Sequence, residues 1–97
     1  MSAYFIFTRE KTTNPAEMEV YAAKSKATLG TFGMKPLVAY GTHEVLEGDS
    51  TEGVVVLEFP TAADARAWYD SPAYQDAMAH RHRGAEYRAI LVEGLPQ

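Results

Sequence analysis

The sequence predicts one small α+β domain in which two helical segments cover a four-stranded antiparallel sheet. Three observations support this prediction. Apolar runs typical of strands occur at four places in the 97 residues, a capped helix follows the first run, and a helix interrupted at Ser71-Pro72 follows the third. The order strand, helix, strand, strand, broken helix, strand is the split βαβ pattern of ferredoxin-like domains. Right-handed crossovers place both helical segments on the same face of the sheet.

The composition limits the classes of function. The hydrophobic share is 46% and the net charge is -4; the first value is normal for a globular domain, and the second argues against general nucleic-acid binding. The absence of cysteine excludes disulfides and thiolate chemistry. The first residues lack the pattern of a signal peptide, and no run approaches the roughly 18 apolar residues of a membrane helix. We therefore expect a soluble cytoplasmic protein with neither nucleic acid nor a membrane as partner.

The first strand is predicted over Ala3 to Thr8, and both of its faces are largely apolar. A strand of this kind is covered on both sides. Asn14 and Pro15 then begin a helix as N-cap and first-turn residue, and Gly30 and Gly33 end it. Tyr21 lies on its apolar face, either as a core residue or with its hydroxyl directed at a ligand.

The second strand is predicted over Leu37 to Leu46, with the third strand at Val54 to Phe59. The short loop between them, from Gly48 to Gly53, predicts an antiparallel hairpin. His43 falls on a mainly apolar face of the second strand. It is either a hydrogen-bonded structural histidine or an acid/base group, because histidine titrates near neutral pH.

The broken helix places an arginine among apolar side chains. Its second segment carries Tyr74, Ala77, Met78 and Arg81 at helical spacing, so Arg81 continues the apolar stripe. Such an arginine extends to the protein edge, pairs with a carboxylate, or anchors an anionic ligand. The candidate carboxylates are Glu47, Glu58 and Glu86. The closing strand is predicted over Arg88 to Glu93.

The histidines do not form a convincing metal site. His80 and His82 are two positions apart on a helix and point in nearly opposite directions. The basic run from His80 to Arg83 is too short to indicate nucleic-acid binding in an acidic chain. Ligation of a haem iron by His43 or His80 is the weakest hypothesis. The prediction is no metal and no cofactor.

All four predicted strands carry apolar residues on both faces, although the helices cover only one face. Leaving five or six medium-sized side chains exposed would forgo on the order of 10 kcal/mol, at ~1.5–3 kcal/mol each. A second copy of the chain, stacked sheet to sheet, would bury them. The sequence therefore predicts a homodimer with a barrel-like core between the two sheets.

The run from Val55 to Arg81, with its FPT, AWY and SPAY segments, a glutamine and the final arginine, resembles the bacterial domain-of-unknown-function family 1330. The Leu46-Glu47-Gly48 turn and the closing Val92-Glu93-Gly94 are also similar to that family. The family is similar to the dimeric α/β-barrel superfamily, which includes cofactor-free monooxygenases, muconolactone-isomerase-like proteins and haem-binding relatives. The resemblance implies a fold and a dimer but no reaction. From Asp49 to Gly53 this chain reads DSTEG, where many relatives carry an aromatic residue and an arginine.

The leading hypothesis is a homodimer that binds a small anionic or enolisable compound in a cleft between the sheet and the helices, with or without cofactor-free catalysis. In that cleft we expect His43 as acid/base, Arg81 as anion anchor, and Trp68, Tyr69 and Tyr40 as walls. The alternative is a non-catalytic structural or interaction module. A sealed interior, an Arg81 neutralised by glutamate and no cleft reaching His43 would favour that alternative.

Overall fold

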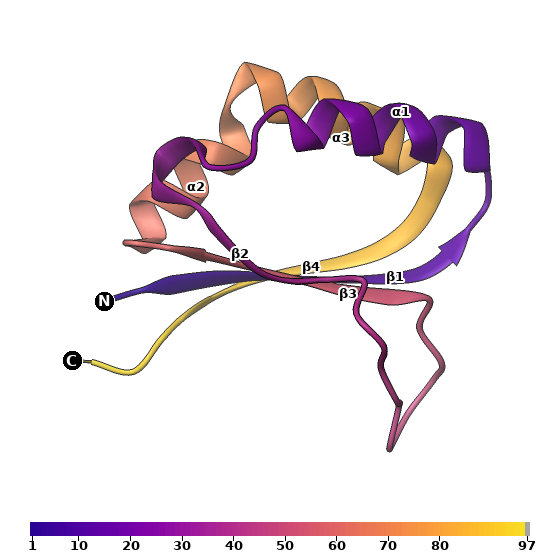
Figure 1. The fold of residues 1–97 in the computed structure, drawn as a ribbon, viewed down its shortest axis with the longest axis horizontal. Helices are drawn as coiled ribbons and strands as arrows, with labels where there is room; N and C mark the ends of the chain where they lie inside the picture. Colours follow the sequence, from indigo (N-terminus) through magenta and orange to yellow (C-terminus); the bar gives the residue numbers. More distant parts are fainter. Residues whose placement is uncertain (97) are drawn as a thin grey trace.

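The computed structural model describes residues 1–96. Its elements are β1 (Ala3–Thr12), α1 (Pro15–Lys26), the 3₁₀ turn η1 (Thr31–Gly33), β2 (Lys35–Ala39), β3 (Gly53–Phe59), α2 (Ala62–Asp70), α3 (Pro72–Gly84) and β4 (Ala85–Glu93). The four strands form one antiparallel sheet in the order β2-β3-β1-β4. Figure 1 shows all three helices on one side of this sheet. The predicted ferredoxin-like α+β fold is confirmed.

Side-chain caps set the beginnings of the helices. The Asn14 side-chain oxygen accepts the Glu17 N–H at 3.4 Å at the start of α1, and Thr61 accepts the Asp64 N–H at 3.1 Å at the start of α2. Ser71 ends α2 and caps α3, where its hydroxyl oxygen accepts the Tyr74 N–H at 3.3 Å. These bonds satisfy amide groups that have no partner inside the helix. The predicted break at Ser71-Pro72 is confirmed.

An aromatic core lies between the sheet and the paired helices α2 and α3. Phe5 of β1 lies with its ring centroid 5.5 Å from that of Trp68 and 6.1 Å from that of Phe59. Trp68 in turn lies 4.0 Å from Tyr74, centroid to centroid. All four side chains are buried. Because each aromatic ring buries a large apolar area, this cluster fixes α2 and α3 on the sheet.

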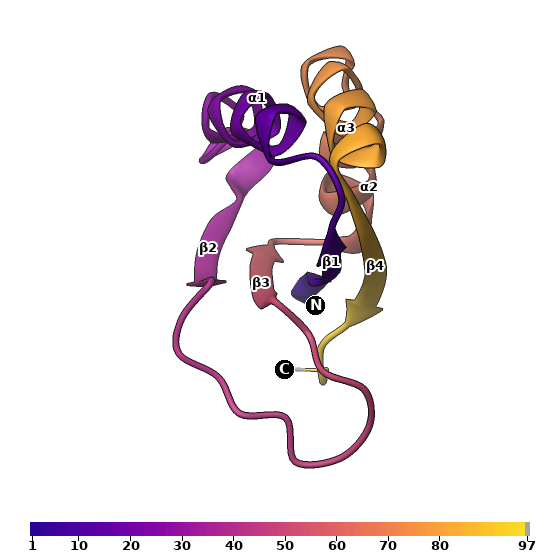
Figure 2. The same ribbon diagram turned by 90° about the vertical axis from the view of Figure 1, so that its right-hand side faces the viewer.

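Helix α1 packs mainly against α3 rather than onto the sheet (Figure 2). Polar bonds link the two helices along their length: Tyr21 to Tyr74 at 2.9 Å, Lys24 to Asp76, and Glu17 to His80 at 2.7 Å. At the end of α3 they also approach closely, since a Cβ atom on Gly84 would lie 2.8 Å from the Met18 sulfur. The outcome is a helix held beside α3 and above β2 and β3.

The second strand ends earlier than the sequence predicts. The prediction of Leu37 to Leu46 is wrong, because β2 covers only Lys35–Ala39. Tyr40 has φ +56°, a left-handed conformation that ends the extended chain. Residues 40–52 instead form a long arm that projects away from the helices (Figure 1). The predicted antiparallel pairing of this strand with the next is confirmed.

Two other strands are longer than predicted. β1 continues from Thr8 to Thr12, and β4 begins at Ala85 instead of Arg88. The added residues pair with each other: Arg9 with Tyr87 and, beyond a register shift, Lys11 with Glu86 and Thr12 with Ala85. This extension brings Arg9 and Tyr87 into the sheet, on the face that the helices cover.

The opposite face of the sheet is apolar and uncovered. Tyr4, Ile6, Val56, Ile90 and Val92 are aligned across three strands on this face. Ile90 is 42% exposed and Val92 is 44% exposed. The sheet therefore carries apolar residues on both faces, as the sequence predicts. Among the described residues, no helix is long and apolar enough to span a membrane.

The buried Trp68–Thr28 hydrogen bond gives a test of the helix packing. The Trp68 indole N–H donates to the Thr28 hydroxyl at 3.1 Å, and Thr28 is only 4% exposed. Thr28→Val is expected to cost about 1–3 kcal/mol, since it leaves the indole N–H buried without an acceptor. Urea unfolding followed by fluorescence of the single tryptophan measures this loss. Thr28→Ser keeps the acceptor as the matched control, and a valine variant as stable as the serine variant would contradict the prediction.

Candidate functional site

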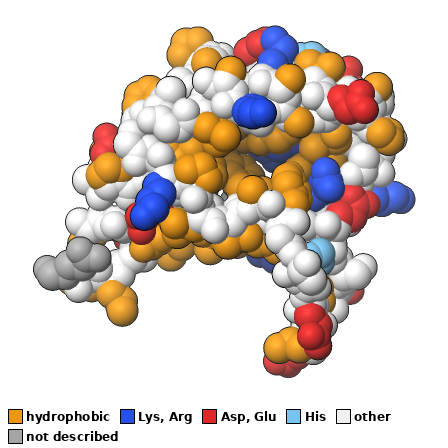
Figure 3. Space-filling view, in the orientation of Figure 1, with side chains coloured by type: hydrophobic (Ala, Val, Ile, Leu, Met, Phe, Trp, Pro, Cys, Tyr) orange, Lys and Arg blue, Asp and Glu red, His pale blue; other side chains and the backbone are white. Residues whose placement is uncertain are grey.

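A cavity of about 390 Å³ lies between the sheet and α1, a size within the ordinary range of small-molecule sites. Figure 3 shows the hollow between the helix layer and the sheet, bordered by hydrophobic side chains, with basic side chains at its back and rim. Its apolar lining comes from α1 and the turn after it, α2, and all strands but β4: Phe7, Met18, Ala22, Leu29, Pro36, Ala39, Val55, Leu57 and Trp68. The cavity exists because α1 is held by α3, and small side chains such as Ala22 and Ser25 face the sheet.

The polar part of the lining is phenolic and cationic. It consists of Arg9, Tyr21, Ser25, Lys26, Tyr40 and Tyr87. No lining residue in the described part of the chain is acidic. An excess of positive charge in a largely apolar hollow favours anionic over cationic occupants.

Arg81 lies directly behind this lining. It is only 3% exposed, and its Cζ lies 5.1 Å from the centroid of the Tyr87 ring, 5.5 Å from that of Phe7 and 6.0 Å from that of Tyr21. Its Nε has no hydrogen-bond partner. Among residues 1–96 no carboxylate lies within ion-pairing distance of it, so none of the three predicted glutamates is its partner. The aromatic rings stabilise this buried cation only in part, and its field reaches the cavity through them.

Two pairs of tyrosine hydroxyls flank Arg81. Tyr21 and Tyr74 are bonded at 2.9 Å, and Tyr40 and Tyr87 at 2.6 Å. Burial raises the pKa of Tyr21 well above its usual value, and the bonded Tyr74 raises it further. Burial also raises the pKa of Tyr87, with a further contribution from its bond to Tyr40. The phenols of Tyr21 and Tyr87 therefore stay protonated and serve as hydrogen-bond donors at neutral pH.

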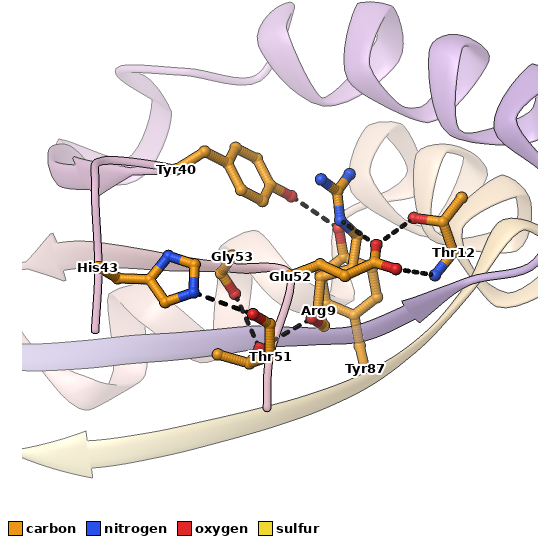
Figure 4. A network of polar contacts seen from close by, with 8 residues as sticks. All are labelled: Arg9, Thr12, Tyr40, His43, Thr51, Glu52, Gly53 and Tyr87. Carbon is orange, nitrogen blue, oxygen red and sulfur yellow. Dashed lines mark hydrogen bonds and ion pairs between the residues drawn. The ribbon is translucent and has the colours of Figure 1, made fainter. Parts of the chain in front are cut away.

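The polar network in Figure 4 ties the arm to the end of β1. Glu52 accepts the backbone N–H of Thr12 at 3.0 Å and its hydroxyl, and pairs with Arg9 at 3.3 Å. The Thr51 hydroxyl and the Glu52 N–H both donate to the Arg9 carbonyl, at 2.8 and 2.7 Å. The arm is thus fixed at its return point, next to the cavity.

The structure brings some predicted site residues together and separates others. Trp68 and Tyr40 line the cavity, and Arg81 lies behind it. Tyr69 is not in the lining; it stacks on Phe5 at 5.3 Å in the core. His43 is also outside it, in the arm and not on an apolar strand face, where its Nε2 bonds the Thr51 carbonyl at 2.9 Å. A carbonyl only accepts, so His43 carries its proton on Nε2.

Sequence reasoning missed Arg9 and Tyr87. Each lies one residue beyond a predicted strand, Ala3 to Thr8 and Arg88 to Glu93. Arg9 continues the alternation of Phe5 and Phe7, and Tyr87 continues that of Ala89 and Leu91. Extending the period-two pattern by one residue at these ends would have placed both side chains on the helix side of the sheet.

The remaining histidines have structural contacts or none that point to metal. His80 bonds Glu17, which also pairs with Arg83 at 3.4 Å. The His80 bond and the nearby Arg83 hold the pKa of Glu17 below its usual value. Within residues 1–96, no three His, Cys, Asp or Glu side chains lie close enough together to hold a metal ion.

The family model of the domain of unknown function DUF1330 matches residues 2–95. The chain belongs to this family. No curated protein matches this DUF1330 chain in sequence.

Solved structures similar to this DUF1330 chain share its fold at low identity. A protein of unknown function from Rhodopseudomonas palustris is 20% identical with a TM-score of 0.73, covering 99% of this chain and 84% of that one. A dimeric ferredoxin-like protein of unknown function from Thermobifida fusca is 18% identical with a TM-score of 0.67, covering 94% and 89%. The cofactor-independent oxygenase SnoaB from Streptomyces nogalater is 14% identical with a TM-score of 0.65, covering 99% and 95%. These likenesses establish the fold.

The attachment of the arm gives a pH test on this DUF1330 chain. The Thr12 hydroxyl and N–H, with Arg9 nearby, hold the pKa of Glu52 below its usual value. A carboxylate with a lowered pKa stabilises the fold above its ordinary pKa, and this contribution disappears as the pH falls through the lowered value. Carbon-detected NMR titration is expected to show this low pKa, and Thr12→Val is expected to raise it by removing one donor. An unchanged Glu52 pKa in Thr12→Val would contradict the assignment.

Proposed function

We propose that this protein binds a small, largely apolar compound with an anionic or enolisable oxygen in the cavity between α1 and the sheet. The observation that carries the proposal is the charge of the site. Arg81 is buried behind the cavity and Lys26 lines it, both without an ion pair among residues 1–96, and no described lining residue is acidic. Burial of an arginine without a carboxylate is costly unless another group offsets it. A bound anion would supply that offset.

The walls favour a planar ligand. Phe7, Trp68, Tyr21 and Tyr87 present aromatic surface, and Ala22 and Ala39 leave room between α1 and β2. Aromatic side chains pack well against flat apolar groups. We therefore place Trp68 and Tyr40 as walls and Arg81 as a charge acting from behind the wall, and we leave His43 and Tyr69 out of the proposed site.

The alternative, a non-catalytic structural module, would be favoured by a sealed interior, a neutralised Arg81 and no cleft at His43. The structure has only some of these features. His43 is not among the residues that line this cavity, so the predicted acid/base group lies outside the proposed site. The interior is not sealed, however, and Arg81 is not neutralised by a glutamate. An open cavity beside an uncompensated cation supports ligand binding over an interaction module.

A reaction at this site would need no resident cofactor if the ligand itself is reactive. SnoaB, which shares this fold, is a cofactor-independent oxygenase. Fold likeness leaves the reaction of this chain open. We thus propose a binding site for an enolisable or anionic compound. If the protein is an enzyme, its reaction would be cofactor-free chemistry on that compound.

We further propose that the working unit is a homodimer joined through the uncovered sheet face. The aligned apolar side chains of that face, which include Ile6, Val56, Ile90 and Val92, have no cover from their own chain. The arm projects to the same side and exposes Leu46 (Figure 1). A second copy would bury both features. The Thermobifida fusca neighbour is described as dimeric.

Filling the cavity is expected to abolish ligand binding. Ala22 lines the cavity, whereas its neighbour Ala23 does not, so Ala22→Trp and Ala23→Trp form a matched pair. In an NMR screen of aromatic acids, phenols and enols, hits on the wild-type chain should bind at least about tenfold more weakly to Ala22→Trp. The same hits should bind Ala23→Trp unchanged. Equal affinities for both variants would place the binding site elsewhere.

A charge on the open sheet face is expected to separate the dimer. Light scattering after size exclusion should give twice the chain mass of 10.7 kDa for the wild type. Ile90→Lys should give the mass of one chain, because a lysine there would have to be buried without a partner. Val20→Lys, at a similarly exposed position on α1, is the control and should remain dimeric. A monomeric wild type at micromolar concentration would refute the dimer.

A further inference from the structure

We propose that the paired hydroxyls of Tyr40 and Tyr87 form an oxyanion-binding site at one end of the cavity, which receives the ionised oxygen of a phenol or enol. The inference rests on the proposed function, because it specifies which ligand group binds and which side chains receive it. Both tyrosines line the cavity, and their hydroxyl oxygens lie 2.6 Å apart (Figure 4).

The protons of this pair leave one donor free. Two phenol groups carry two protons, and the bond between them uses one. Neither hydroxyl has another partner among residues 1–96. The second proton is therefore available to a ligand oxygen. Burial and the bond to Tyr40 raise the pKa of Tyr87, which favours its protonated form.

Each phenol of the pair has a guanidinium over its ring. The Arg9 Cζ lies 4.7 Å from the Tyr40 ring centroid, and the Arg81 Cζ lies 5.1 Å from that of Tyr87. A cation on the ring face draws electron density from the phenol and strengthens its hydroxyl as a donor. The same two charges favour an anion that accepts the one free proton of the pair.

Tyr40 is held in place by features that the fold alone does not require. Its φ of +56° is unfavourable for a tyrosine, and it turns the side chain back over the sheet. Gly53 leaves room for the ring, since a Cβ atom there would lie 2.3 Å from the Tyr40 Cδ1. The backbone N–H of Tyr40 donates to the Val54 carbonyl at 2.9 Å. Backbone strain at a residue that lines a cavity is typical of functional sites.

The donors suit one oxygen better than a carboxylate. A carboxylate is best recognised by the two parallel N–H groups of a free arginine fork. Arg9 does not offer that fork freely, because its Nε faces Glu52 and its guanidinium lies on the Tyr40 ring. One free phenolic proton beside aromatic and aliphatic walls matches a single oxygen on a flat ring. Phenols, enols and their anions are this class.

The test uses 4-nitrophenol, which ionises near neutral pH and whose anion alone absorbs violet light, and 4-nitroanisole, which lacks the ionisable oxygen. The wild-type chain should lower the pKa of bound 4-nitrophenol by about one unit, a roughly tenfold preference for the anion. Tyr40→Phe and Tyr87→Phe should restore the value of the free compound. Gly53→Ala should do the same while keeping both hydroxyls, since it displaces the Tyr40 ring.

4-Nitroanisole and a control variant separate this inference from the proposed function. Tyr40→Phe and Tyr87→Phe should bind 4-nitroanisole as the wild type does, because they keep the aromatic walls. Tyr69→Phe should leave the pKa of bound 4-nitrophenol lowered. If the wild type binds both probes without lowering that pKa, the oxyanion site is refuted while the ligand cavity stands. Loss of 4-nitroanisole binding in the phenylalanine variants would also refute it, because the hydroxyls would then only support the wall. If neither probe binds the wild type, the proposed function fails as well.

Discussion

The attachment of α1 to α3, rather than to the sheet, is the constraint on which the rest of this structure depends. The hydrogen bonds of Tyr21 to Tyr74 and of Glu17 to His80 hold α1 beside α3, in the same layer above the sheet. The residues that α1 turns toward the sheet include Ala22 and Ser25, which are too small to fill the space below. The aromatic core therefore seals only the end of the sheet beneath α2. The other end stays open as the cavity, at a cost in dispersion contacts that a bound ligand would recover.

The charged side chains at the outer surface also differ from those beneath α1. At the outer surface the basic residues pair with acidic ones, as Arg66 does with Asp70 and Lys24 with Asp76. Beneath α1 only Arg9 is matched in this way, by Glu52. Within residues 1–96, Arg81 and Lys26 form no ion pair, and Arg81 lies among the rings of Phe7, Tyr21 and Tyr87. Exposed pairs contribute little to stability. The uncompensated cations therefore indicate what the interior can bind rather than how the fold is held together.

Local patterns predicted the architecture because helix caps and the alternation of apolar residues in strands depend on residues that are close in sequence. Asn14, Thr61 and Ser71 all act as caps, and the apolar alternation of the strands places Phe5 and Leu57 in the core. The end of β2 could not be predicted in this way. The run after Leu37 alternates like a strand, but the left-handed turn of Tyr40 depends on Tyr87, Arg9 and Gly53, which lie far away in the sequence. His43 was predicted on a strand face because that strand was extended past Ala39; it lies in the arm instead. The helical spacing placed Arg81 in an apolar stripe, and the structure buries it there. Its tyrosine neighbours depend on how α1, β4 and α3 meet, which local patterns do not predict.

The titration behaviour of the site restricts the chemistry that it can support. No histidine or carboxylate lines the cavity in the described part of the chain. Burial raises the pKa of the Tyr21 and Tyr87 phenols there, so these two are poor bases and good donors. A site of this kind does not remove a proton from a weakly acidic carbon. It can hold a compound that ionises readily and stabilise the resulting oxyanion by hydrogen bonds and two nearby guanidinium groups. Any reaction in this cavity would then take its reactivity from the electron-rich anion of the ligand, and the protein would contribute orientation and charge.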